Sequence, residues 1–176
     1  IGGMVANNSG GEKSLEFGKT ENFVDQLDVV LADGKSYCLK PLSEAELKSK
    51  ISQEDFEGGL YNKMFKMLDE NYEKIKAAKP HVSKNSTGYN LWDIWDRQSG
   101  VFDLTKLFVG SQGTLGLISD IRFKLIHSPA HSGVLVAFMK DIDNLGKVIN
   151  AVLPHKPASF EAFDNHTLML SIKFFP

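Results

Sequence analysis

The chain has 176 residues, of which 42% are hydrophobic and 24% are charged, an ordinary composition for a soluble globular protein. Its net charge is −2 and its basic residues form no strip, which excludes a nucleic-acid groove. No apolar run reaches the ~20 residues of a membrane-spanning helix, and no signal peptide pattern is visible. The single cysteine, Cys38, excludes an intrachain disulfide and favours a cytoplasmic protein.

Both ends of the sequence resemble cuts through a larger protein. The first residue is Ile1, and the last letters, "SIKFFP", lie inside an apolar run. We therefore expect a fragment of a longer chain. Apolar surface left uncovered in such a fragment favours homo-oligomers or pairing at an open strand edge.

Residues 23–40 predict a β-hairpin, because apolar residues recur at every second position and Asp33-Gly34 suits a tight primed turn. Ser43 and Glu46 then form a capping-box pattern, which predicts a short helix through about Ile51.

A longer helix is predicted for residues 60–78, where apolar residues recur at spacings of three and four until Pro80 ends the pattern. The apolar stripe indicates a helix packed on a sheet, and a methionine groove for a partner is the alternative. A helical turn is expected before Gly110. Residues 115–125 then alternate as a long strand with one solvent-facing side towards its end.

The last third predicts a strand at 133–139, a helix at 142–153, a strand at 158–164 and a helix beginning near Asn165. Strand, helix and strand in about thirty residues form one crossover unit. We expect this unit to open a second domain, with the boundary near residue 130.

Two glycine clusters carry most of the chemical information, "GGMVANNSGG" at 2–11 and "GSQGTLG" at 110–116. The second cluster precedes a strand, whereas a Rossmann fingerprint precedes a helix, and no P-loop lysine follows either cluster. Glycines let backbone amides approach a phosphate or a flat ring, but they also serve plain turns. The residues alone leave both interpretations open.

Three ordered motifs resemble those of one enzyme family. The opening stretch through "DGKSY", then "VSKNSTGYNLW" (82–92), then "LFVGSQGTLGLISDIRFKLI" (107–126) resemble the vanillyl-alcohol-oxidase/PCMH superfamily, in its D-lactate dehydrogenase and glycolate oxidase branch. The resemblance implies an α+β fold. Residues 1–129 would be the second half of a PCMH-type FAD-binding domain, a mixed or antiparallel sheet with flanking helices. Residues 130–176 would begin a ferredoxin-like cap domain.

The resemblance also implies FAD as cofactor and residues that contact it. These are Gly2, Gly3, Ala6, Asn7, Ser9, Gly10, Gly11, Gly18, Gln112, Gly113, Gly116 and Ile118. Gln112 departs from the family pattern, in which glutamate is usual, so the charge is absent here. The "KNxTGY" signature, which contains Tyr89, implies either a loop locked by tyrosine packing or a contribution to the site.

The implied reaction is oxidation of a small 2-hydroxy acid to the 2-oxo acid, with an electron acceptor that the sequence does not indicate. The alternatives are another FAD enzyme of the same fold, such as a sugar or aldonolactone oxidase or a sugar-nucleotide reductase, and a non-catalytic interaction module. No catalytic residue is assigned. Arg97 and Arg122 are better explained as loop and sheet-surface residues, and Pro129 between His127 and His131 argues against a helical metal site.

Overall fold

The computed structural model describes residues 1–82 and 84–175, whose contacts divide the chain into two units. Unit 1 contains Ile1–Ser9 and Lys19–His127, and unit 2 contains Gly10–Gly18 and Ser128–Pro176. Ser83 of the "VSKNSTGYNLW" motif and the terminal Pro176 lie outside the described residues. Helices and antiparallel strands both occur, so the predicted α+β class is confirmed.

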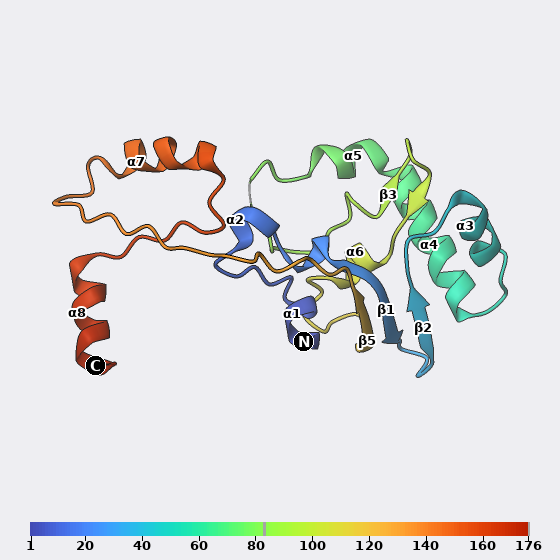
Figure 1. Cartoon of the computed structure of the whole chain (residues 1–176). Helices are drawn as coiled ribbons and strands as arrows, with labels where there is room; N and C mark the ends of the chain where they lie inside the picture. Colours follow the sequence, from blue (N-terminus) through green and yellow to red (C-terminus); the bar gives the residue numbers. More distant parts are fainter. Residues whose placement is uncertain (83, 176) are drawn as a thin grey trace. The chain divides into compact units, whose positions relative to one another are not determined.

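Unit 1 holds both sheets and most of the helices (Figure 1). In chain order its elements are α1 (Gly2–Ala6), η1 (Thr20–Asn22), β1 (Val24–Val30), β2 (Ser36–Leu39), α3 (Glu44–Ile51), α4 (Phe56–Glu70), α5 (Tyr72–Ala77), β3 (Trp95–Asp96), β4 (Val101–Phe102), α6 (Thr105–Phe108) and β5 (Leu117–Phe123).

A three-stranded antiparallel sheet in the order β2–β1–β5 forms the centre of unit 1 (Figure 1). Leu27 of β1 pairs with Leu39 on one side and Ile121 on the other. Leu27, Leu39 and Val29 are completely buried, so the central strand supplies much of the core.

The predicted hairpin is confirmed, but its turn differs from the prediction. Both primed two-residue turns need a positive φ at their first central residue, whereas here only the second one, Gly34, has a positive φ, of +78°. The Gly34 amide donates to the Leu31 carbonyl, and the Leu31 amide donates to Lys35. The connection is therefore a three-residue loop closed by a left-handed glycine.

The alternation predicted for 115–125 is interrupted by a bulge. Asp120 lies opposite Asp28 and Ile118 lies opposite Val29, so Ser119 is an extra residue in β5. Its hydroxyl donates to the Asp28 carbonyl at 3.1 Å. A bulge shifts which residues face inward. Consequently Ile118 is half-buried, as Ile121 is, while Leu117 is 72% exposed.

Helix α3 begins with the predicted capping box. The Glu46 amide donates to the Ser43 hydroxyl, and the Glu46 carboxylate accepts from the Ser43 amide at 2.8 Å and lies 3.1 Å from Lys40 Nζ. These two partners, the Ser43 backbone first, lower the pKa of Glu46 from 4.5 to about 2.

Ser43→Ala is expected to destabilise unit 1 by about 1 kcal/mol at neutral pH and to raise the pKa of Glu46. Because the folded pKa is depressed, the Glu46 contribution is present above pH 4.5 and is lost as the pH falls towards 2. An NMR titration of the Glu46 carboxyl group measures its pKa in the wild type and in the variant. A wild-type Glu46 that titrates near 4.5 would contradict the capping geometry.

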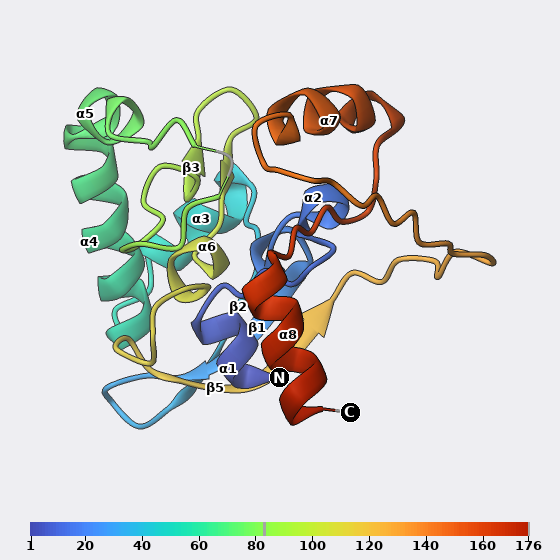
Figure 2. The same cartoon turned by 90° about the vertical axis from the view of Figure 1, so that its left-hand side faces the viewer.

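The predicted helix 60–78 exists but is longer at its start and is divided in two. Helix α4 begins at Phe56, because the Asp55 carboxylate caps the Gly58 amide at 2.9 Å. It ends at Glu70, where the Asn71 side chain donates to the Met67 carbonyl, and α5 follows (Figure 2). The pair Gly58-Gly59 concealed this start, since glycine is a poor helix former.

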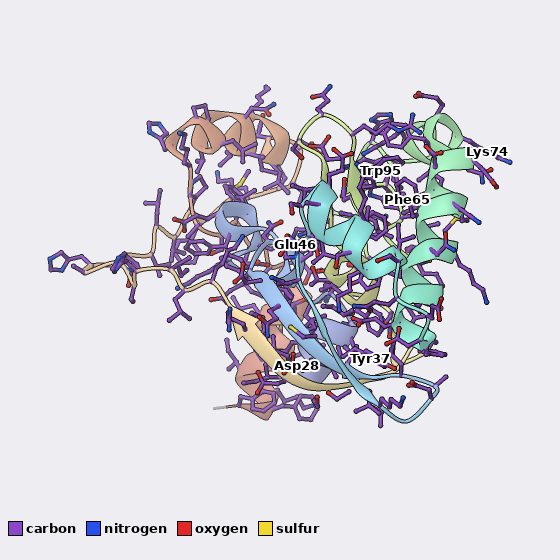
Figure 3. All side chains as sticks on the ribbon, turned by 90° about the vertical axis from the view of Figure 1, so that its right-hand side faces the viewer. Asp28, Tyr37, Glu46, Phe65, Lys74 and Trp95 are labelled. Carbon is purple, nitrogen blue, oxygen red and sulfur yellow. The ribbon has the colours of Figure 1, made fainter. Side chains whose placement is uncertain are left out.

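Aromatic side chains join α4 to the small β3–β4 sheet. Phe65 lies 4.9 Å from Trp95 between ring centroids, and the two are neighbours in Figure 3. Phe102 is completely buried and contacts the rings of Tyr61 and Phe65. Its backbone exchanges two hydrogen bonds with Leu42, each 2.9 Å. Phe102 therefore links the helices to the end of β2.

Unit 2 contains α2 (Ser14–Phe17), α7 (Leu145–Val152), η2 (Leu153–His155) and α8 (Asn165–Phe174) (Figure 2). The helix predicted near Asn165 is confirmed, and Asp164 caps it by accepting from the Thr167 amide at 2.7 Å.

The strands predicted at 133–139 and 158–164 are wrong, and the crossover unit therefore does not form in this structure. A strand needs a neighbouring backbone to complete its hydrogen bonds. No β-ladder involves the described residues of unit 2. Val134, Leu135 and Phe138 are 86–93% exposed, so the apolar pattern is present without the pairing that it predicts.

Candidate functional site

The two glycine clusters meet in unit 1 although they lie far apart in the sequence. The carbonyls of Val5 and Ala6, at the end of α1, accept from the amides of Gly110 and Gln112 at 2.9 and 2.8 Å. The Gln112 side chain also donates to the side-chain oxygen Oδ1 of Asn7 at 3.1 Å, across 105 positions. The first and third motifs therefore form one local structure.

The loop 110–116 has an unusual backbone. Gly110, Gln112 and Gly113 have φ of +89°, +57° and +73°, the left-handed region that non-glycine residues rarely adopt. Gln112 is held there by its two bonds to α1 and Asn7. The position at which the family pattern has glutamate therefore serves, with an uncharged amide, as a link to the first cluster.

The segment that follows α1 is anchored to η1 through Asn8, Thr20 and Glu21, which sequence reasoning missed, and through the predicted Ser9. Asn8, with φ +47°, donates to the Glu21 carboxylate at 2.8 Å and accepts from the Glu21 amide at 3.1 Å. The Ser9 carbonyl accepts from both the amide and the hydroxyl of Thr20. Asparagine between glycines was the available signal, because it tolerates left-handed backbone.

The second motif is tied to both of the others. The Tyr89 hydroxyl lies 2.7 Å from the Thr114 hydroxyl, which in turn donates to the Ser111 carbonyl at 2.5 Å. The Lys19 ammonium donates to the Asn85 carbonyl. Of the two roles that the "KNxTGY" signature left open, this geometry favours a loop locked by Tyr89.

The cluster glycines that lie in unit 1 fall into two groups. A Cβ on Gly116 would lie 2.6 Å from the Val30 carbonyl oxygen, and one on Gly110 would lie 3.3 Å from Asn8. These two positions need glycine for the packing of the protein itself. A Cβ on Gly2, Gly3 or Gly113 would meet no atom within 4 Å. These three border open space, which leaves room for a bound group.

The remaining predicted site residues lie in different places. Gly10, Gly11 and Gly18 belong to unit 2, where Gly18 ends α2 with φ +74°. Ile118 lies in β5 of unit 1, paired with Val29. The structure therefore joins Ala6 and Asn7 to the 110–113 loop, whereas the Ser9 carbonyl is bonded to Thr20 of η1.

The two arginines lie where the sequence predicted. Arg97 occupies the turn between β3 and β4, bonded to Asp69 at 2.6 Å and stacked over Tyr72 with its guanidinium carbon 4.0 Å from the ring centroid. Arg122 is exposed on β5. Among the described residues no group of three histidine, cysteine or acidic side chains is placed to hold a metal ion. No helix in the described ranges is long and apolar enough to cross a membrane.

Curated relatives match almost the whole chain. D-2-hydroxyglutarate dehydrogenase of Pseudomonas putida is 29% identical, with 98% of this chain and 17% of the relative aligned. Glycolate oxidase subunit GlcD of Bacillus subtilis is 27% identical over 97% of this chain and 26% of the relative. D-lactate dehydrogenase of Archaeoglobus fulgidus is 49% identical over 98% and 28%.

These relatives match the D-lactate dehydrogenase and glycolate oxidase branch indicated by the three motifs, so the resemblance is confirmed. No family model matches the chain. The chain spans between about a sixth and just over a quarter of the length of the relatives named here.

Proposed function

We propose that this chain is part of a flavin-dependent oxidoreductase that oxidises a small 2-hydroxy acid to the 2-oxo acid. The names of its relatives, which are dehydrogenases or oxidase subunits of D-2-hydroxyglutarate, glycolate and D-lactate, support the reaction class. FAD is the proposed cofactor, and when bound it supplies the hydride acceptor. This chain's own residues supply binding and orientation.

In this proposal residues 1–129 are the second half of a PCMH-type FAD-binding domain, and residues 130–176 begin the cap domain. The single observation that carries the proposal is the joining of three distant motifs by the Gln112–Asn7, Tyr89–Thr114 and Lys19–Asn85 hydrogen bonds. A set of loops fixed in this way, with bare glycines facing open space, suits the close approach of a flat ring or a phosphate.

Within unit 1, the proposed contacts to the flavin come from Gly2, Gly3 and Gly113, beside which no protein atom occupies the Cβ position. Ala6, Asn7, Ser9 and Gln112 hold the backbone around them. Gly10, Gly11, Gly18, Gly116 and Ile118 remain proposed contacts on the family resemblance alone.

The test is the visible absorption spectrum of the full-length protein that contains this chain, followed by D- and L-2-hydroxy acids with a dye acceptor. We expect flavin bands that bleach with one of these acids. Flavin that no hydroxy acid reduces would move the function to another substrate class on the same cofactor. A colourless protein that takes up no FAD would overturn the proposal and favour an interaction module.

A glycine variant locates the flavin within that protein. Gly3→Ala is expected to weaken FAD binding by roughly tenfold while leaving the apoprotein as stable as wild type or slightly more so, because alanine favours helix. Gly59→Ala is the matched control, since it also lies in a helix with open space at its Cβ. Equal FAD affinity in both variants would exclude α1 from the site.

A further inference from the structure

A cavity of about 370 Å³ in unit 1 is not accounted for by the proposed flavin contacts. It is bordered by Asn8, by the turn at 19–22, by residues within 79–82 and 85–93, and by residues within 106–110. Its volume lies at the lower end of the range for small-molecule sites, so it suits a ligand of only a few heavy atoms.

Three lysines converge on this cavity. Lys19, Lys79 and Lys106 all line it, and the only acidic side chains on its described lining are Glu21 and Asp93. The lining therefore carries one more positive than negative charge, although the chain as a whole has a net charge of −2. Cations held together in a partly enclosed space attract an anion.

Among the described lysines that line the cavity, Lys106 is the one for which no ion pair is found. Lys79 lies 2.8 Å from Asp93, and Lys19 lies 3.3 Å from Glu21 with its side chain only 9% exposed. Within the described residues, the hydrogen bond of Lys106 goes to the backbone carbonyl of Glu21 at 3.1 Å, which is a neutral acceptor. An ammonium group has three donors, so Lys106 keeps donors for a ligand.

The neutral groups on the lining point to the same ligand chemistry. Ser86, Thr87 and Trp92 also line the cavity, and side chains of these types can donate through a hydroxyl or an indole N–H. A small oxyanion can accept hydrogen bonds from ammonium, hydroxyl and indole groups at the same time. A cation would instead be repelled by the three lysines.

We propose that this cavity binds a small oxyanion, a carboxylate or a phosphate group, with Lys106 and Lys79 as its charged contacts and Lys19 as the buried charge behind them. The proposal rests on the cavity alone and does not depend on flavin binding.

The two tryptophans of the chain provide the test, because Trp92 lines the cavity and Trp95 packs on Phe65 outside it. The ¹⁵N-labelled 176-residue chain is titrated with sodium phosphate and, separately, sodium succinate, at an ionic strength held constant with sodium chloride. We expect the Trp92 indole signal to shift and saturate while the Trp95 signal stays in place.

The two titrations distinguish a phosphate ligand from a carboxylate ligand. Saturation with phosphate alone identifies a phosphate group, and saturation with succinate alone identifies a carboxylate. No shift of Trp92, or equal shifts of both tryptophans, overturns the proposal.

Lysine variants test which charged side chains contact the anion. Lys106→Gln and Lys79→Gln are each expected to weaken binding by roughly tenfold, the effect of losing one charge-assisted hydrogen bond. Lys63→Gln, an exposed α4 position away from the cavity, is the control and should bind like wild type. A Lys106→Gln protein with an unchanged spectrum elsewhere and unchanged affinity also overturns the proposal.

Discussion

Replacing Phe102 with alanine is expected to lower the free energy of unfolding of unit 1 by about 3–5 kcal/mol. The ring is completely buried and contacts Tyr61 and Phe65, with centroid distances of 6.1 and 6.4 Å. Removing it leaves a cavity where α4 meets β3–β4, and the surrounding backbone is fixed by the paired hydrogen bonds between Phe102 and Leu42.

Urea unfolding followed by tryptophan fluorescence measures this loss, because Trp92 and Trp95 both lie in unit 1. Val101→Ala is the matched control on the same strand. Val101 is 37% exposed, so its truncation should cost less than about 1 kcal/mol. Similar unfolding midpoints for the two variants would contradict the packing described for β4.

Gly116→Ala is expected to cost about 1–3 kcal/mol, because the new methyl group would lie 2.6 Å from the Val30 carbonyl oxygen and 3.2 Å from Leu31. Val30 is the last residue of β1, and Leu31 follows it. The clash can therefore be relieved only if β1 shifts relative to β5. The same urea experiment measures the loss.

Leu117→Ala, at the next position, separates this clash from a general effect on β5. Leu117 is 72% exposed and pairs with Val30, so we expect a change within about 0.5 kcal/mol. A Gly116→Ala protein as stable as Leu117→Ala would mean that space exists beside Gly116, and the position would then belong with the open glycines.

Local signals predicted several elements of both units. The hairpin, the Ser43–Glu46 capping box and the helix at Asn165 each depend on residues within a few positions of one another, so spacing was sufficient. The start of α4 was missed because two glycines argued against a helix, and the Asp55 cap outweighed them.

Contacts between distant residues determine the features that local sequence patterns could not predict. The strands predicted at 133–139 and 158–164 had the right composition, but the described part of unit 2 offers no partner strand, and strand formation depends on the partner. The bulge at Ser119 is set by the pairing with β1, and no composition signal marks it.

The candidate site was predicted in part. The motif resemblance pointed to both glycine clusters, but spacing alone could not predict that Gln112 would contact Asn7 or that Tyr89 would contact Thr114. Nor could spacing distinguish Gly116, where a side chain would clash with the Val30 carbonyl oxygen, from Gly113, which borders open space.

The reciprocal bonds between Leu42 and Phe102 also bear on how the fold tolerates changes in length. They hold Leu42, which follows β2, beside Phe102 of β4, so the long connection between these two residues starts and ends at one place. Closing a longer excursion costs entropy only as the logarithm of its length. Helices α3–α5 could therefore be extended or shortened at small thermodynamic cost, with the three-stranded sheet left in register.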